Sequence, residues 1–241
     1  SEGFKPDELV NALNNYFSVM VDIIMEHGGI VDKYIGDAIM AFFGAPVKHD
    51  DDAQQAVLAA LNMQEALEDF NKEQKANGKP AFITGIGISY GVVTVGNIGS
   101  EKKMDYTIIG DMVNLGSRLE GLTKTYRQKL IFSESVYRKI KDDIPCRMID
   151  KVVVKGKTQG EKIFTAERKV SKRRQKAWDF HHAGLKSYYQ RDFDKSSEYF
   201  QQVLKLIKDD FIAQMFLERC ARYKKNPPST EWNGVEILTS K

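Results

Sequence analysis

The sequence predicts an α+β fold in which helices pack on one antiparallel-rich sheet, followed by a small all-helical extension. Two observations carry this prediction. Up to about residue 167, stretches with helical apolar spacing alternate with pairs of β-branched stretches, which is typical of helices packed on a sheet of hairpins. From about residue 178 onward, helical stretches follow one another and strand patterns stop.

The N-terminal part predicts a helix followed by a hairpin. Residues 4–27 carry apolar side chains at helical spacing, and Gly28-Gly29 ends the helix. Residues 30–43 predict two antiparallel strands joined by the two-residue turn Gly36-Asp37. Asp and Gly are common turn formers, so the turn alone accounts for them. The alternative is that Asp37, at the hairpin tip, is a ligand for a hard cation.

The middle of the chain continues the alternation of helices and strands. Helices are expected at 53–77, 111–126 and 134–140, and strands at 104–110, 130–132 and 148–154. We expect residues 81–89 to pair with 92–96 through a turn near Tyr90-Gly91, with a loop at 97–103. Asn114 and Arg118 stand four residues apart in a predicted helix and so share one face.

A basic run at residues 168–176 marks a boundary, and a solvated linker at 168–177 is favoured over an anion-binding patch. The extension at 178–241 predicts three helices, at 178–190, 194–207 and 209–223. Its spacing of small and aromatic residues is similar to one helix pair of a tetratricopeptide array. Because a single such repeat cannot bury its own face, we expect it to pack on the preceding part of the chain or on a protein partner.

Composition excludes several classes of function. The formal net charge of +3 over 241 residues gives no global reason to bind nucleic acid. Cys146 and Cys220 are isolated, which disfavours a disulfide framework or a zinc site and favours a reducing compartment. No membrane-spanning segment is predicted in the chain. We therefore expect a cytoplasmic protein, with a membrane tether upstream left open.

Several separate motifs lie in a fixed order in this first part. They are Val31-Asp32-Lys33-Tyr34-Ile35-Gly36-Asp37-Ala38, Gly96-Asn97-Ile98-Gly99, Asp105-Tyr106-Thr107, Val113-Asn114-Leu115, Ser117-Arg118-Leu119 and Val154-Lys155-Gly156-Lys157. On these motifs the chain resembles a class III nucleotidyl cyclase. The resemblance implies a ferredoxin-like catalytic domain at residues 1–167 and a head-to-tail homodimer with shared active sites.

The resemblance also implies the roles of individual residues. Asp37 matches one of two aspartates that bind two Mg²⁺ (or Mn²⁺) ions per active site, while Lys33 and Thr107 match the pair that reads the purine. Adenine presents an acceptor at N1 and a donor amino group, which a lysine and a threonine can satisfy. Guanine presents donors at N1 and N2, which call for a carboxylate. The implied substrate is therefore ATP.

The remaining matches concern the reacting phosphates. Asn114 and Arg118 match helix residues that orient the ribose and stabilise the reacting phosphate, and Lys155 matches the lysine on the terminal phosphates. Attack of the ribose 3′ oxygen on the α-phosphorus gives 3′,5′-cyclic AMP and pyrophosphate, so negative charge must be neutralised at both ends of the reacting line. The expected activity is that of an adenylate cyclase.

The resemblance is incomplete at its N-terminal end. The family's first strand, which carries the other metal aspartate, is expected before residue 1. We therefore expect a fragment of a longer cyclase that supplies one of two metal carboxylates and is poorly active. A guanylate cyclase and a catalytically dead, dimerising signalling domain remain as alternatives. A diguanylate cyclase is disfavoured because Gly36-Asp37-Ala38 is not its Gly-Gly-Asp/Glu-Glu-Phe turn.

Overall fold

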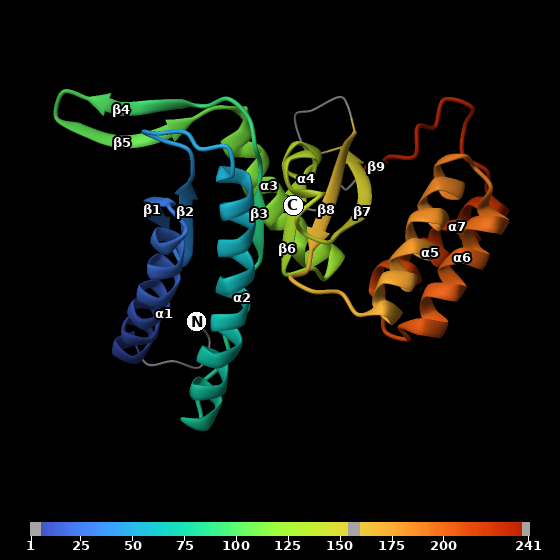
Figure 1. The fold of residues 1–241 in the computed structure, drawn as a ribbon, viewed down its shortest axis with the longest axis horizontal. Coiled ribbons are helices and arrows are strands. Elements are labelled where there is room, and N and C mark those ends of the chain that lie inside the picture. The colour runs from blue at the N-terminus through green and yellow to red at the C-terminus, as the bar shows by residue number, and fades with distance from the viewer. Residues whose placement is uncertain (1–5, 154–159, 238–241) are drawn as a thin grey trace.

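The computed structural model describes residues 6–153 and 160–237, and Figure 1 shows their arrangement. In chain order the elements are α1 (Pro6–Glu26), β1 (Ile30–Ile35), β2 (Ala38–Phe42), α2 (Asp52–Ala76), β3 (Ile86–Ile88), β4 (Thr94–Ser100), β5 (Lys103–Ile109), α3 (Asp111–Tyr126), β6 (Leu130–Ser133), α4 (Glu134–Ile140), β7 (Cys146–Val153), β8 (Glu161–Ala166), α5 (Lys172–Tyr189), α6 (Phe193–Leu206), α7 (Phe211–Lys225) and β9 (Glu236–Ile237). The predicted α+β class with a helical extension is confirmed.

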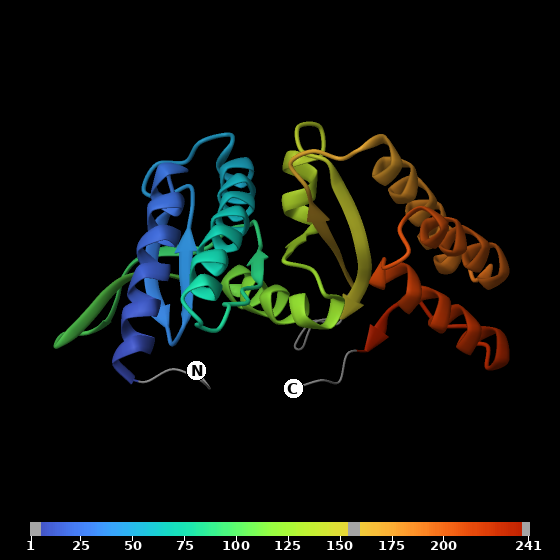
Figure 2. The same ribbon diagram turned by 90° about the horizontal axis from the view of Figure 1, so that it is seen from below.

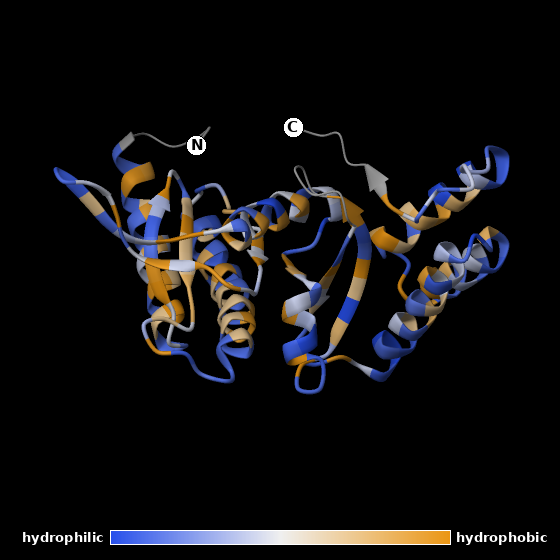
Figure 3. Ribbon diagram, turned by 90° about the horizontal axis from the view of Figure 1, so that it is seen from above, coloured by the Kyte–Doolittle hydropathy of each residue, from blue (hydrophilic) through white to orange (hydrophobic). Residues whose placement is uncertain are grey.

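The strands form three separate sheets within the described part of the chain. A five-stranded sheet has the order β3-β6-β8-β7-β9, while β1 with β2 and β4 with β5 form two antiparallel hairpins. Figure 2 shows α1 beside the first hairpin and α5, α6 and α7 at the opposite end of the molecule. The second hairpin projects from the body, with a hydrophilic tip and hydrophobic residues along its stem (Figure 3).

The hairpin of β1 and β2 contains the predicted two-residue turn. Ile35 pairs with Ala38, and Gly36 takes a φ of 63°, which a glycine adopts without steric cost. The register shifts between Val31 and Lys33, so the ladder assigns no partner to Asp32. Such a β-bulge bends the strand and changes the direction in which the neighbouring side chains point.

The predicted pairing of 81–89 with 92–96 is wrong. Strand β3 pairs in parallel with β6, and β4 pairs with β5 across the stretch expected as a loop. The reason at β3 is close packing on α3, because a Cβ on Gly87 would lie 2.2 Å from the Glu120 nitrogen and the Gly116 carbonyl oxygen. Strand β8 was not predicted, since its apolar residues are adjacent rather than alternating. Pairing with β6 and β7 on both sides specifies it.

The C-terminal helices pack against the sheet through buried charged groups. Arg147 on β7 donates to both carboxylate oxygens of Asp210, at 2.7 and 2.9 Å, and to Nδ1 of His181, at 2.9 Å. A second group lies beside it: Asp150 accepts from the hydroxyls of Tyr126 and Tyr189 and from Arg219. The end of α3, strand β7, α5 and α7 are therefore held together by two buried networks.

The start of this extension lies inside the predicted basic linker. Helix α5 begins at Lys172, and the Ser171 side chain accepts from the backbone nitrogen of Arg174 as an N-cap. The predicted boundaries at 167 and 177, and the tetratricopeptide assignment, stay predictions. None of the helices in residues 6–153 and 160–237 combines the length and hydropathy of a membrane span.

A groove of about 1720 Å³ runs between the first hairpin and strand β3. Strand β2 lines it from one side and β3 from the other, and each has one edge with no strand paired to it in the described part of the chain. Apolar residues of α1 and α2 also line the groove. Ile83 and Val92, which lie along it, are 97% and 96% exposed. Two open strand edges and exposed apolar side chains indicate room for an extended segment.

Replacement of the carboxylate at the centre of the second buried network should destabilise the fold strongly. Asp150→Ala removes the ion-pair partner of Arg219 and the acceptor of two tyrosine hydroxyls, so we expect a loss of about 3–5 kcal/mol in the free energy of unfolding. Urea denaturation measures it. The matched control is Asp194→Ala, which breaks an exposed ion pair with Lys224 and should cost less than about 1 kcal/mol. An equal loss of unfolding free energy in Asp150→Ala and Asp194→Ala would show that Asp150 does not stabilise the fold through its buried network.

Stability should fall in mild acid because of His181. Its Nε2 donates to the Met148 carbonyl and its Nδ1 accepts from Arg147, so only the neutral ring fits both contacts. Burial first, and then Arg147 and His182, hold the pKa of His181 well below its ordinary value of 6.5. Asp210 is paired with the same Arg147. Since the unfolded chain takes up this proton near pH 6.5 and the folded chain does not, stability falls as the pH drops below that value.

The measurement is the melting temperature between about pH 7.5 and pH 5.5, because each such histidine removes up to about 1.4 kcal/mol per pH unit. The pKa of the neighbouring His182 is also lowered, by burial and by Arg147, so part of the slope remains in any His181 variant. His181→Gln should flatten the pH dependence, whereas the exposed control His49→Gln should leave it intact. An unchanged slope in His181→Gln refutes this explanation.

Candidate functional site

The structure brings Lys33 and Thr107 together although 74 residues separate them. Lys33 Nζ on β1 donates to Thr107 Oγ1 on β5 at 3.1 Å. Asp32 completes the cluster, because its Oδ2 accepts from Thr107 Oγ1 at 2.6 Å and from the Ile108 nitrogen at 3.3 Å. Its Oδ1 lies 3.3 Å from Lys33 Nζ. Asp32 was not among the predicted site residues. The sequence feature that could have indicated it is its position next to Lys33 inside a strand.

Asp37 lies at the tip of the first hairpin, where it is exposed and lines the large groove. Its charge reaches Tyr16, on α1 beneath the groove. The pKa of Tyr16 is raised above its ordinary value, first by burial and to a smaller degree by Asp37, while a hydrogen bond with Thr84 opposes the shift. Asp37 therefore presents an accessible carboxylate to the groove.

Helix α3 carries the two predicted catalytic residues one turn apart. It starts at Asp111, directly after Gly110, whose φ of 152° is rarely adopted by residues with a side chain. Asn114 is exposed and lines the same groove as Asp37, whereas Arg118 is half-buried. The buried residues Leu115 and Leu119 fix the opposite face of the helix in the core.

The predicted site residues thus fall into two groups in a single subunit. Lys33 and Thr107 form one group, and Asp37 and Asn114 line the groove as the other. In the described part of the chain, no hydrogen bond or ion pair joins the two groups. Lys155 lies outside the described residues, since β7 ends at Val153 and the description resumes at residue 160.

The predicted Mg²⁺ or Mn²⁺ site can be compared with the side chains that could bind a metal ion. Across residues 6–153 and 160–237, no cluster of three or more His, Cys, Asp or Glu side chains is arranged to hold a metal ion. Mg²⁺, however, is commonly bound by one or two carboxylates together with substrate phosphates and water. An exposed Asp37 fits as one such ligand, and a two-metal site needs a further carboxylate.

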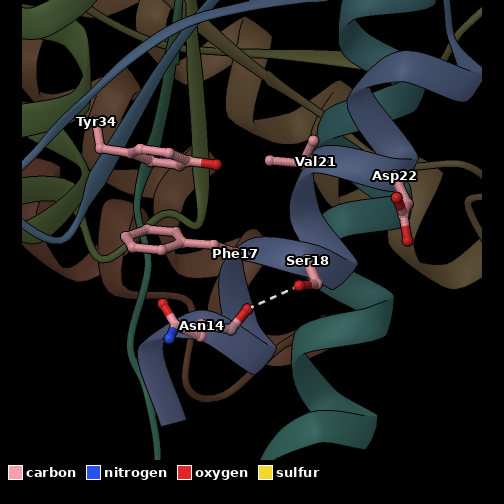
Figure 4. Close-up of a pocket in the computed structure, with 6 residues that line it drawn as sticks. All are labelled: Asn14, Phe17, Ser18, Val21, Asp22 and Tyr34. Carbon is pink, nitrogen blue, oxygen red and sulfur yellow. Dashed lines mark hydrogen bonds between the residues drawn. The ribbon is translucent and has the colours of Figure 1, made fainter. Parts of the chain in front are cut away.

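A second, smaller pocket of about 370 Å³ lies between α1 and β1. Phe17 and Tyr34 pack there with ring centroids 4.4 Å apart, and Asn14, Ser18, Val21 and Asp22 complete the lining (Figure 4). It contains none of the predicted site residues. Its aromatic pair fixes the outer face of the hairpin on α1.

Comparison with known proteins identifies the fold and the kind of site. A sequence model of the adenylate and guanylate cyclase catalytic domain matches residues 1–167. The chain belongs to this family. Its catalytic domain therefore carries the two groups of predicted residues described above.

Curated relatives support this membership. An adenylate cyclase of Anabaena cylindrica is 43% identical over 171 residues, which cover 68% of this chain and 33% of that protein. Adenylate cyclase 1 of Rhizobium meliloti (strain 1021) is 36% identical over 164 residues, 68% of this chain and 25% of that protein. The chain thus spans a third or less of the length of these relatives.

Solved structures of cyclases share the fold. The adenylyl cyclase CyaB from P. aeruginosa is 35% identical, with a TM-score of 0.65 over 72% of this chain and 88% of that one. The guanylyl cyclase Cya2 is 36% identical, with a TM-score of 0.61 over 68% and 83% of the two chains. Cyclases named for either purine are therefore similar to this domain, and overall likeness does not choose between ATP and GTP.

Proposed function

We propose that this domain is the catalytic part of an adenylate cyclase, which converts ATP to 3′,5′-cyclic AMP and pyrophosphate. The observation that carries the proposal is the contact of Lys33 Nζ with Thr107 Oγ1, which presents a donor and an acceptor side by side. Adenine offers the complementary acceptor at N1 and donor at its amino group. The curated relatives at 43% and 36% identity are both named adenylate cyclases, which supports the same choice.

Guanylate cyclase is the alternative, because Cya2 is similar to this domain. Guanine would need an acceptor for its N1 and N2 donors. The one carboxylate of the Lys33–Thr107 cluster is Asp32, whose side chain is completely buried and already accepts from Thr107 and from Ile108. It is not presented to a base, and this favours ATP.

The other residues act by neutralising charge and by positioning. Asp37 would hold Mg²⁺ or Mn²⁺ together with the triphosphate, and the bound metal would supply activation of the 3′ hydroxyl and neutralisation of phosphate charge. Asn114 hydrogen-bonds the ribose and fixes the direction of attack. Arg118 offers a planar set of donors to the transferring phosphate, and Lys155 places a positive charge on the leaving pyrophosphate.

We propose that two subunits share each site. Lys33 and Thr107 pair with each other and are not among the residues that line the groove with Asp37. A two-fold homodimer can bring Asp37 of one chain to Lys33, Thr107, Asn114, Arg118 and Lys155 of its partner. Apolar side chains on the projecting hairpin, including Met104 and Ile109, are 58% and 50% exposed, which suits a surface that a second subunit covers.

The second metal carboxylate is proposed to lie on an extended segment that fills the groove. Strands β2 and β3 offer it two open edges, and Asp37 lies at the same groove. Without that segment, one metal ligand and part of the core are missing, so the chain alone should turn over ATP poorly. A catalytically dead, dimerising domain is the non-enzyme alternative, and it should not bind an ATP analogue in the presence of Mn²⁺.

Exchange of the purine-reading pair should change the preferred nucleotide. In the natural full-length protein, Lys33→Glu with Thr107→Cys replaces the donor for adenine N1 by an acceptor for guanine N1 and N2. We expect the ratio of kcat/KM for ATP to that for GTP to fall by about a hundredfold or more. Steady-state kinetics with both nucleotides measures it. If the double variant keeps its ATP preference, Lys33 and Thr107 do not read the base.

Mixing two inactive variants should restore activity if the site is shared. Asp37→Asn and Arg118→Ala should each abolish turnover in the full-length protein, because one loses a metal ligand and the other a phosphate contact. After random exchange of subunits, about half of the dimers are mixed and each contains one intact site, so about a quarter of wild-type turnover should return. A mixture of Asn114→Ala with Arg118→Ala is the control. In this proposal both residues come from the subunit that supplies Lys33 and Thr107, so no mixed dimer contains an intact site. No recovery in the first mixture would place all residues in one subunit.

A further inference from the structure

The bulge in β1 directs a buried carboxylate at the purine-reading pair. The register between β1 and β2 shifts between Val31 and Lys33, so two residues of β1 occupy the space of one at Asp32. The Asp32 side chain is 0% exposed, and its Oδ2 accepts from Thr107. Lys33, the next residue, reaches the same hydroxyl. Consecutive residues of one strand thus meet a single side chain of another sheet.

We propose that Asp32 is a positioning residue that determines base specificity by fixing the direction of the Thr107 hydroxyl. The inference rests on the proposed nucleotide cyclase function and concerns a residue to which that function assigned no part. Asp32 does not touch the nucleotide. It acts through Thr107 and Lys33, both of which it contacts.

The hydrogen-bonding capacity of Asp32, Thr107 and Lys33 decides what Thr107 can offer to a ligand. A carboxylate accepts and does not donate, so the Thr107 hydroxyl must use its single hydrogen on Asp32, at 2.6 Å. The oxygen of Thr107 keeps two lone pairs, and Lys33 Nζ donates to one of them at 3.1 Å. What Thr107 can still offer to a ligand is therefore an acceptor only.

This fixed direction separates the two purines. The amino group of adenine is a donor and pairs with the remaining lone pair of Thr107, while Lys33 donates to adenine N1. Guanine carries a carbonyl oxygen at the corresponding position, which would face that lone pair without a hydrogen between them. A threonine hydroxyl free to rotate would serve either base. With its hydrogen held by Asp32, it serves adenine.

A purely structural role for Asp32 is the competing explanation. Its contact with the Ile108 nitrogen joins the first hairpin to the second, so loss of the side chain also affects the fold. The test must therefore read base selectivity apart from stability. Asp32→Ala is suited to this, because Thr107 and Ile108 both donate to the same oxygen, Oδ2, and alanine removes it. The hydroxyl hydrogen of Thr107 then has no acceptor in the protein and is free to point at the ligand.

The experiment compares wild type and Asp32→Ala of the full-length protein by kcat/KM for ATP and for GTP, together with melting temperature. We expect the ATP to GTP ratio to fall about tenfold or more, which corresponds to one hydrogen bond gained or lost. Asp69→Ala, the same chemical change at an exposed site on α2, should leave the ratio unchanged. An unchanged ratio in Asp32→Ala overturns the inference, even if the melting temperature falls.

If Asp32→Ala does not fold, the wild-type enzyme gives the answer with purine riboside triphosphate, which lacks the amino group. An orientated Thr107 acceptor predicts a kcat/KM about tenfold below that for ATP, and equal values overturn the inference. Failure of the proposed function looks different, because wild type then makes no cyclic nucleotide from any purine triphosphate. In that case the inference falls with it.

Discussion

The contact of Asp32 with Thr107 and Ile108 is the interaction on which the candidate site depends. The hairpins β1–β2 and β4–β5 belong to separate sheets, so no strand ladder sets the position of one relative to the other. One buried carboxylate that accepts from a hydroxyl and from a backbone nitrogen of β5 supplies that constraint. A charged acceptor is worth more than a neutral one in a buried setting. It therefore brings Lys33 and Thr107, the proposed purine-reading pair, together across 74 positions of sequence.

The C-terminal helices belong to the same mechanical unit as the site. Helix α3 carries Asn114 and Arg118 in its first half, and its last residue, Tyr126, donates to Asp150 in the network that also holds Arg219 of α7. Residues on one helix move together, so the extension fixes the end of the element that carries the predicted phosphate contacts.

Local chemistry made much of this structure predictable. The turn at Gly36-Asp37, helix α3 and the three C-terminal helices follow from glycine positions and apolar spacing. The structure has all of them, although α5 begins at Lys172, earlier than the spacing predicted. The pairing of β3 was not predictable in this way. It depends on a glycine, Gly87, that lets α3 approach, and on pairing with β6, which is more than forty residues away in sequence. Residue spacing alone carries no information on such distant contacts.

The same limit applies to the site. Lys33 and Thr107 were predicted as a pair from motifs, whereas the part played by Asp32 required the bulge, its burial and its contacts. Asp37 and Asn114 were predicted from separate motifs, and the structure shows that they line one groove, whose lining does not include Lys33 or Thr107. The sharing of a site between subunits remains the central claim of this account.

A crystal structure of the full-length protein with a non-hydrolysable ATP analogue and Mn²⁺ tests that claim most directly. The account predicts adenine N1 within hydrogen-bond distance of Lys33 Nζ and the amino group within the same distance of Thr107 Oγ1, in one subunit. It predicts that the metal ions on the triphosphate are bound by Asp37 of the other subunit. A nucleotide held by Lys33 and Asp37 of the same chain, or a base bound away from Thr107, would contradict it.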